Sequence, residues 1–154
     1  KTFVMNFLPV GINIENEQIL IVGGGNVALH KIEGLERFTH NIKVVAPQIH
    51  EGIRSRQWIE IEERGFESGD LDGHLLVYAA TGDRELNNRI RTEGRKHRCL
   101  VNVVDKSRDC DFLSPAILKV ENMTVAVSSN GKDVHAAVRW RNQIQSLVND
   151  GIIK

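Results

Sequence analysis

The sequence predicts an α/β fold, in which a doubly wound parallel sheet is followed by a small strand hairpin and a helix. Between residues 18 and 104, short apolar segments alternate with helical patterns, as in sheets that carry helices on both faces. Residues 75–80 are continuously apolar, which is typical of a strand buried on both faces of a parallel sheet. After residue 111 the alternation stops. We therefore expect two regions, residues 1–111 and 112–154.

The elements of the first region follow from its apolar periodicity. Val27, Ile32 and Leu35 recur at close to helical spacing after a glycine-rich turn. Asp83 is a suitable N-cap for a helix that begins at residue 84. The expected strands are 18–22, 42–46, 58–62, 75–80 and 99–104, and the expected helices are 26–38, 49–56 and 84–97.

The second region has no strand–helix–strand order. Residues 112–120 and 123–129 predict two strands joined by a turn at Glu121-Asn122, and residues 133–148 predict an amphipathic helix. A piece of this size cannot bury its apolar strands alone, so we expect the hairpin to pair with a second copy in a homodimer. The alternative is that it packs onto the chain's own sheet as an edge hairpin.

The composition excludes several classes of protein. The chain has 154 residues, with 20 Lys and Arg against 20 Asp and Glu, so nothing in its net charge points to nucleic acid or to an anionic membrane. No apolar run is long enough to cross a bilayer, and the first residues do not resemble a secretory signal. Cys99 and Cys110 are too few for a disulfide framework, which favours a reducing cytoplasm. The six histidines lack ligand-type spacing, so we expect no bound metal.

One glycine-rich turn carries the strongest functional signal. An apolar strand pattern ends in Gly23-Gly24-Gly25, and a helical pattern begins at once with Asn26-Val27-Ala28. The spacing Gly23-x-Gly25-x-x-Ala28 is the alanine-ended form of the dinucleotide-binding fingerprint. Gly23 allows the tight turn, Gly25 lets a pyrophosphate approach the backbone, and Ala28 lets the helix pack on the strand. A tight strand-to-helix turn without a ligand is the alternative explanation.

The end of the second expected strand departs from the usual pattern for NAD. An acidic residue normally stands there and binds the ribose hydroxyls. This sequence has Val45-Ala46-Pro47-Gln48, and Gln48 is neutral. The choice between NAD and NADP is therefore open at this position.

Three further places follow expected strands and are candidates for chemistry. Thr81 lies in a turn that would touch a cofactor, or that serves only to cap the next helix. Asp105 is the one ionisable group at the end of strand 99–104, and it is either a general base or a plain loop aspartate. Ser128, Ser129 and Lys132 suit the carboxylates of a substrate, although turn propensity explains these residue types equally well.

Together these segments resemble precorrin-2 dehydrogenase, the dehydrogenase module of siroheme synthases. The resemblance covers nearly the whole chain in the right order. It rests on Phe7-Leu8-Pro9-Val10, Ile21–Ala28 with Lys31, Val44–Pro47, Ala79–Asp83 with Asn87, Val101–Asp105, Asp111-Phe112, Pro115–Ile117 and Val125–Lys132.

The resemblance implies a function. Such enzymes use NAD to convert precorrin-2, a tetrapyrrole with many carboxylates, into sirohydrochlorin. They are homodimers with a Rossmann domain followed by a dimerisation region, and some members also insert ferrous iron. Asp105 matches the family's catalytic aspartate. The family's NAD contacts map onto the glycine loop Gly23–Gly25 with Asn26 and Val27, onto Pro47 and Gln48, and onto Thr81.

The resemblance also has departures. After its serines the family usually has a further glycine and a proline, whereas this chain has Asn130-Gly131-Lys132-Asp133. The helical domain that many members carry beyond this region is largely absent from a chain that ends at Lys154. Two other functions therefore stay open: a module that binds NAD and a partner without chemistry, and a ferrochelatase in which NAD is secondary.

Overall fold

The computed structural model describes residues 5–104 and 106–154, which form two compact units. One unit spans Pro9–Phe112, and the other contains residues 5–8 and 113–154. Among the helices of the described residues, none is long and apolar enough to span a membrane.

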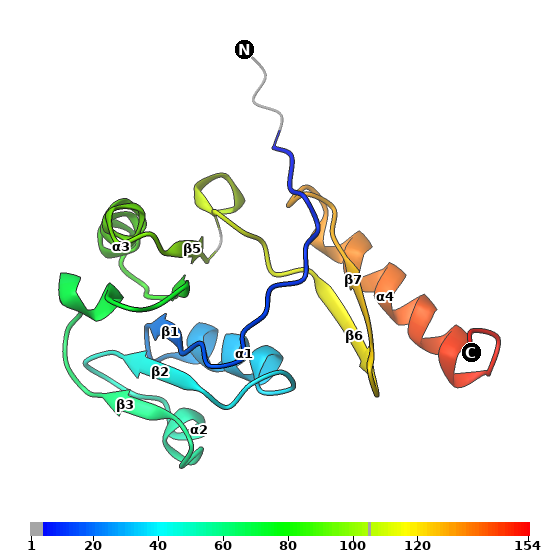
Figure 1. The fold of residues 1–154 in the computed structure, drawn as a ribbon, viewed down its shortest axis with the longest axis horizontal. Coiled ribbons are helices and arrows are strands. Elements are labelled where there is room, and N and C mark those ends of the chain that lie inside the picture. The colour runs from blue at the N-terminus through cyan, green and yellow to red at the C-terminus, as the bar shows by residue number, and fades with distance from the viewer. Residues whose placement is uncertain (1–4, 105) are drawn as a thin grey trace. The chain divides into compact units, whose positions relative to one another are not determined.

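The larger unit is a five-stranded parallel sheet with the order β3-β2-β1-β4-β5 (Figure 1). Its strands are β1 (Ile19–Val22), β2 (Ile42–Val45), β3 (Glu60–Glu62), β4 (Leu76–Ala79) and β5 (Leu100–Val103). In the register, Ile21 of β1 lies between Val44 of β2 and Tyr78 of β4. The strand order reverses between β1 and β4, which is the switch point where ligands bind in open α/β sheets. The predicted doubly wound Rossmann-type fold is confirmed.

Three α-helices and one short 3₁₀ turn connect these strands: α1 (Asn26–Leu35), α2 (Glu51–Arg54), η1 (Ser68–Leu71) and α3 (Arg84–Lys96). A second 3₁₀ turn, η2 (Ser107–Asp109), follows β5. The helix predicted over residues 26–38 ends at Leu35, whose carbonyl accepts the N–H groups of Phe38 and Thr39 in a closing turn. The helix predicted over 49–56 is only four residues long. It begins where the His50 ring accepts the Gly52 N–H at 2.9 Å.

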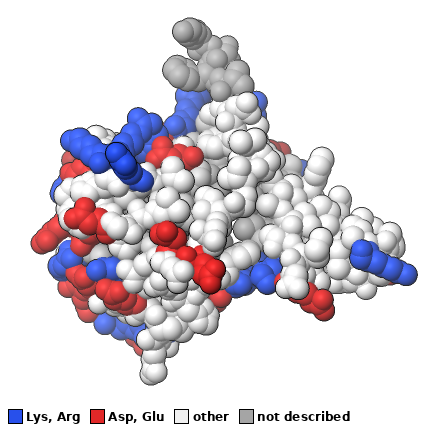
Figure 2. All heavy atoms as spheres, viewed as in Figure 1, with Lys and Arg blue, Asp and Glu red and all other residues white. Residues whose placement is uncertain are grey.

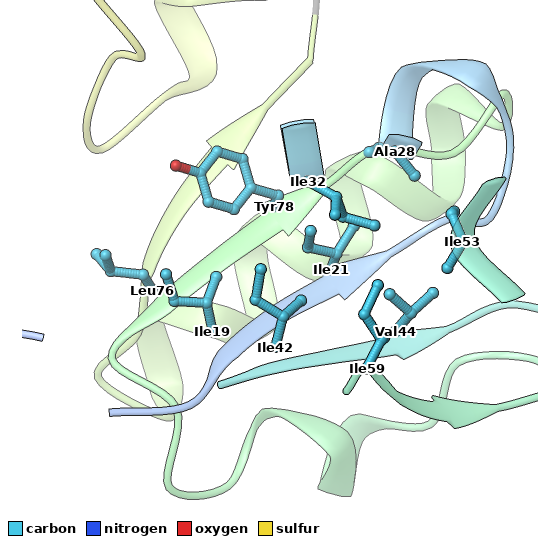
Figure 3. Close-up of a cluster of buried hydrophobic side chains, with 11 residues drawn as sticks. Ile19, Ile21, Ala28, Ile32, Ile42, Val44, Ile53, Ile59, Leu76 and Tyr78 are labelled. Atoms are coloured by element: carbon cyan, nitrogen blue, oxygen red, sulfur yellow. The ribbon is translucent and has the colours of Figure 1, made fainter. Parts of the chain in front are cut away.

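The core lies between the sheet and the helices α1 and α2. Every residue of β1 is buried, and alternate strand side chains point to opposite faces. Ile19 and Ile21 join Ala28 and Ile32 of α1 on one face, together with Val44, Ile53, Tyr78 and other buried residues. Figure 3 shows Ile32 pointing toward Ile21 across this interface. The small third position of the glycine fingerprint, Ala28, is fully buried there, as its predicted packing role requires.

The helix α3 packs closely on β5. A Cβ at Gly94 would lie 2.5 Å from a methyl group of Val101, so the helix approaches the strand as near as a glycine allows. The segment after β5 returns along the same strand, because the Asp111 N–H donates to the Val101 carbonyl at 2.8 Å and Asp111 Oδ2 accepts the Val101 N–H at 3.0 Å. Arg91 of α3 pairs with the same carboxylate at 3.3 Å.

The smaller unit is an antiparallel hairpin with one helix: β6 (Ala116–Val120), β7 (Met123–Val127) and α4 (Val134–Asn149). Within this unit the hairpin forms a two-stranded sheet of its own. The predicted first strand began at residue 112, but the Phe112 carbonyl is bound by the Asn102 amide of β5 at 3.0 Å. Met123, Val134 and Trp140 expose more than half of their surface. On the face drawn in Figure 2, charged side chains crowd over the parallel-sheet unit and are sparse over the hairpin and α4.

One buried ion pair holds the loop between β3 and β4. Asp70 is 9% exposed, and its two oxygens accept hydrogen bonds from the Arg64 guanidinium at 2.6 and 2.9 Å. Asp70 also accepts the Glu67 N–H at 2.8 Å. Burial alone raises the pKa of a carboxyl group, but the bonds from Arg64 and Glu67 outweigh it and hold the pKa of Asp70 below its ordinary value. The ionised form therefore stabilises the fold.

We expect Asp70→Asn to lower the free energy of unfolding at pH 7 by about 2 kcal/mol, because it removes hydrogen bonds between charged groups. Since the folded pKa is depressed, this contribution is present above the ordinary aspartate pKa, about 3.9, and is lost as pH falls through the folded value. Urea unfolding of both proteins at pH 7 and at pH 3 measures the difference. Glu63→Gln, which breaks an exposed pair with Arg54, is the control and is expected to cost less than about 1 kcal/mol. An equal loss in the two variants would contradict the role given to Asp70.

Candidate functional site

A cleft of about 970 Å³ opens at the carboxyl ends of the parallel strands. Its walls are the glycine loop after β1, the loop after β2, Gly65 and Phe66 beyond β3, and the loop after β4. Val103, Val104 and Lys106 line its remaining side. The cleft thus lies at the reversal of strand order, where open α/β sheets bind their ligands.

Gly23 and Gly24 allow the glycine loop to fit between the loops that follow β2 and β4. Gly23 has a φ of +130°, and a Cβ there would overlap the Ala80 carbonyl oxygen. A Cβ at Gly24 would overlap the Gln48 carbonyl oxygen, and the Gly24 carbonyl accepts the His50 N–H at 2.7 Å. Both residues therefore allow the loops after β2 and β4 to contact the glycine loop backbone to backbone.

The third glycine faces open space. A Cβ at Gly25 would meet no atom within 4 Å. Gly25 is the N-cap of α1, and no side chain caps this end of the helix or places a carboxylate in its first turn. Asn26 and Val27 of that turn line the cleft. The unpaired N–H groups and the positive helix end suit a pyrophosphate, so the residues present fit a dinucleotide.

The loop after β2 contributes Pro47, Gln48 and His50 to the cleft. Among the described lining residues, this loop supplies no carboxylate for ribose hydroxyls. The His50 ring is already engaged at Nδ1 by the Gly52 N–H. The geometry therefore leaves the choice between NAD and NADP as open as the sequence does.

Thr81 is held by Asn87, a residue that the motif analysis assigned no role. The Thr81 hydroxyl lies 2.6 Å from Asn87 Oδ1, and Asn87 Nδ2 donates to the Thr81 carbonyl at 3.0 Å. Asp83 caps α3 by accepting the N–H groups of Glu85 and Leu86. Both Thr81 and Asn87 line the cleft. In the sequence Asn87 stood out only as part of the resemblance, together with Ala79–Asp83, which gave it no role.

The described lining of the cleft carries one acidic and two basic residues. Within the described part of the chain, Asp83 is the one acidic residue among those lining the cleft, and its carboxylate is committed to capping α3. Arg84 and Lys106 are the lining cations. The Lys106 ammonium lies 3.5 Å from the Asp109 carboxylate and 3.3 Å from the Asn88 amide oxygen. The case for an anionic ligand therefore rests on the uncapped start of α1 rather than on these side chains.

The predicted catalytic Asp105 lies outside the described residues. Its neighbours in the chain, Val104 and Lys106, both line the cleft. The Cys110 thiol accepts the Val103 N–H at 3.2 Å and lies 3.2 Å from the Lys106 carbonyl, so it joins the two sides of this loop. Burial raises the pKa of Cys110, which keeps it a neutral thiol. Both cysteines are free and buried.

The predicted substrate residues belong to the smaller unit. Ser128 Oγ accepts the Asn130 N–H at 3.2 Å, and Ser129 Oγ accepts the Asp133 N–H at 2.8 Å. The Lys132 N–H donates to the Ser129 carbonyl at 3.2 Å. These bonds build the turn that leads into α4, as the turn alternative predicted. The lysine ammonium group takes no part in them.

Phe66 is the wall residue that no sequence signal identified. It follows the edge strand β3, and the Arg89 guanidinium of α3 lies 5.4 Å from its ring centroid. No pattern within the chain links an aromatic residue in this loop to α3. Among residues 5–104 and 106–154, no cluster of three His, Cys, Asp or Glu suits a metal ion.

Known proteins resemble this chain in sequence and in fold. The siroheme synthase of Nitrosococcus oceani is 35% identical over 149 residues, which cover 94% of this chain and 31% of that protein. The siroheme synthase of Azotobacter vinelandii is 36% identical over 154 residues, with 96% and 32% covered. The chain thus spans about a third of the length of these relatives.

A solved structure, that of SirC, a precorrin-2 dehydrogenase, has the same fold with a TM-score of 0.78 at 23% identity, over 91% of this chain and 70% of that one. A family model described as "Putative NAD(P)-binding" matches residues 10–116. Because that match covers most of the chain and contains the whole parallel sheet and its cleft, the protein belongs to this NAD(P)-binding family.

Proposed function

We propose that the chain binds NAD in the cleft and dehydrogenates precorrin-2 to sirohydrochlorin in siroheme biosynthesis. The observation that carries the proposal is the uncapped start of α1, which opens into the cleft at the switch point of the sheet. The names of the similar proteins, siroheme synthase and precorrin-2 dehydrogenase, support the substrate and the reaction.

In this proposal the chain's own residues bind and orient the dinucleotide. Gly25 and the first turn of α1, at Asn26 and Val27, receive the pyrophosphate, while Gly23 and Gly24 hold the loop in place. Pro47 and Gln48 lie against the ribose, and Thr81 forms the opposite wall. NAD supplies the hydride acceptor when it is bound.

The oxidation of precorrin-2 removes two electrons as a hydride, which leaves on the nicotinamide, and a proton, which needs a base. We assign the base to Asp105, whose carboxylate takes that proton or stabilises positive charge on a pyrrole nitrogen. Precorrin-2 carries many carboxylates, so the hydroxyls of Ser128 and Ser129 and the ammonium of Lys132 are its proposed contacts.

The two regions of the chain have different proposed roles. Residues 1–111 form the NAD-binding domain, and residues 112–154 form a dimerisation region. Exposed Met123, Val134 and Trp140 in the hairpin-and-helix unit support a homodimer, since apolar surface of this kind is normally covered. We also infer that the protein works in the cytoplasm, where its two thiols stay reduced.

The first experiment is an anaerobic absorbance assay with purified protein, precorrin-2 and NAD. We expect NADH and sirohydrochlorin to appear together. Asp105→Asn is expected to lose most of the turnover, about 10²–10⁴-fold, and to keep NAD affinity nearly unchanged, because the base acts on the substrate. Ferrous iron added after the reaction tests for a chelatase. Wild-type turnover in Asp105→Asn would remove this residue from the mechanism. Tight NAD binding without any turnover would favour the non-catalytic module.

A second prediction concerns the open space at Gly25. Gly25→Ala is expected to raise the Kd for NAD at least tenfold, because the new methyl group stands where the pyrophosphate approaches the backbone. Its Tm is expected to stay near that of the wild type, since no atom lies within 4 Å of the added carbon and the φ of −93° suits alanine. Calorimetric titration and thermal unfolding measure the two quantities.

Gly34→Ala is the matched control on the same helix, because a Cβ there also meets no atom within 4 Å. It is expected to stabilise the helix by about 0.5–1 kcal/mol and to leave NAD affinity unchanged. Unchanged affinity in Gly25→Ala would show that the pyrophosphate does not approach the start of α1.

A further inference from the structure

Asn87 is a buried polar residue that holds the loop after β4. It lies on the second turn of α3, is 8% exposed, and lines the cleft. Its Oδ1 accepts the Thr81 N–H at 3.2 Å and the Thr81 hydroxyl at 2.6 Å, and its Nδ2 donates to the Thr81 carbonyl at 3.0 Å. One side chain thus binds every polar group of one loop residue.

The single proton of the Thr81 hydroxyl is used within this network. It lies closer to Asn87 Oδ1 than to the Asp83 carbonyl, which is 3.0 Å away, and it accepts the Asp83 N–H at 3.1 Å. A hydroxyl has one proton to donate. With that proton directed at Asn87, the Thr81 hydroxyl has none left to donate to a ligand, and Asn87 fixes the path of the Thr81 backbone.

The peptide group between Ala80 and Thr81 connects Asn87 to the glycine loop. Its N–H is the one that Asn87 accepts, and its carbonyl oxygen is the atom that a Cβ at Gly23 would overlap. The described peptide bonds are all trans, so these two groups point to opposite sides of the same rigid plane. Asn87 therefore holds one side of the peptide, and Gly23 rests on the other.

We propose that Asn87 is a positioning residue for dinucleotide binding, which keeps the glycine loop in place through the Ala80–Thr81 peptide. The inference rests on the proposed binding of NAD in this cleft. Loss of the side-chain amide frees that peptide to rotate, and the Gly23 turn then loses the surface against which it is packed. The effect reaches the pyrophosphate site without any contact between Asn87 and the pyrophosphate.

The test compares two buried amides. Asn87→Leu removes all three bonds to Thr81 without adding charge, and Asn102→Leu is the matched control. Asn102 is 4% exposed on β5, and its amide bonds the Phe112 carbonyl rather than the cofactor loops. Both variants are expected to lose stability, since each breaks buried hydrogen bonds. Titration with NAD well below each Tm is expected to give a Kd about tenfold higher for Asn87→Leu and a nearly wild-type Kd for Asn102→Leu.

Hydrogen exchange of the free proteins distinguishes positioning of the glycine loop from a general loss of stability. Asn87→Leu is expected to speed exchange in residues 80–83 and also in residues 23–25, whereas loss of α3 stability alone would leave the glycine loop protected. If Asn87→Leu does not fold, Asn87→Ser serves in its place, because its shorter side chain cannot reach both backbone groups of Thr81.

Equal NAD affinity in wild type and the Asn87 variant would overturn the inference, and so would an equal loss of affinity in both leucine variants. A wild-type protein that binds no NAD would instead overturn the proposed function, and this inference with it. The wild-type titration alone identifies that case.

Discussion

Close backbone contact between three loops is the constraint on which the site depends. The glycine loop lies so near the carbonyls of Ala80 and Gln48 that no Cβ fits at Gly23 or Gly24. Hydrogen bonds from Gly23 to Val45 and from His50 to Gly24 join the same loops. Because each loop follows a different strand, their contact requires the strand order of the sheet. The strand order that defines the fold therefore also forms the cleft.

That arrangement leaves one helix start available to a ligand. The other α-helices begin with a side chain that accepts a backbone N–H: His50 for α2, Asp83 for α3 and Asp133 for α4. The start of α1 has Gly25 at this position and no such acceptor. Unpaired N–H groups at a helix end are costly when buried and useful beside an anion. A side-chain cap at this position would fill the space that the glycine keeps open.

The strands of the sheet and the glycine loop could be predicted from the sequence because both depend on local patterns. Apolar runs with glycine and proline at their ends identify parallel strands, and the Gly23-x-Gly25-x-x-Ala28 spacing identifies the turn. The role of Asn87 could not be predicted from the sequence. Asparagine is common on the polar face of a helix, and the burial of Asn87 depends on how α3 packs. Phe66 is a similar case, because its place in the cleft depends on Arg89 from another element. The helix predicted over residues 49–56 is shorter in the structure, because it begins only where the His50 ring accepts the Gly52 N–H.

The electrostatics of the cleft arise in the same non-local way. A chain with equal numbers of acidic and basic residues gives no hint of an anion site. Folding brings Asp83, Arg84 and Lys106 to the same cleft, where the Asp83 carboxylate caps α3 and the Lys106 ammonium lies 3.5 Å from the Asp109 carboxylate. Fields from such groups are focused in a cleft with low-dielectric walls. The attraction of this cleft for an anion therefore comes from the backbone N–H groups at the uncapped start of α1, rather than from an excess of positive residues.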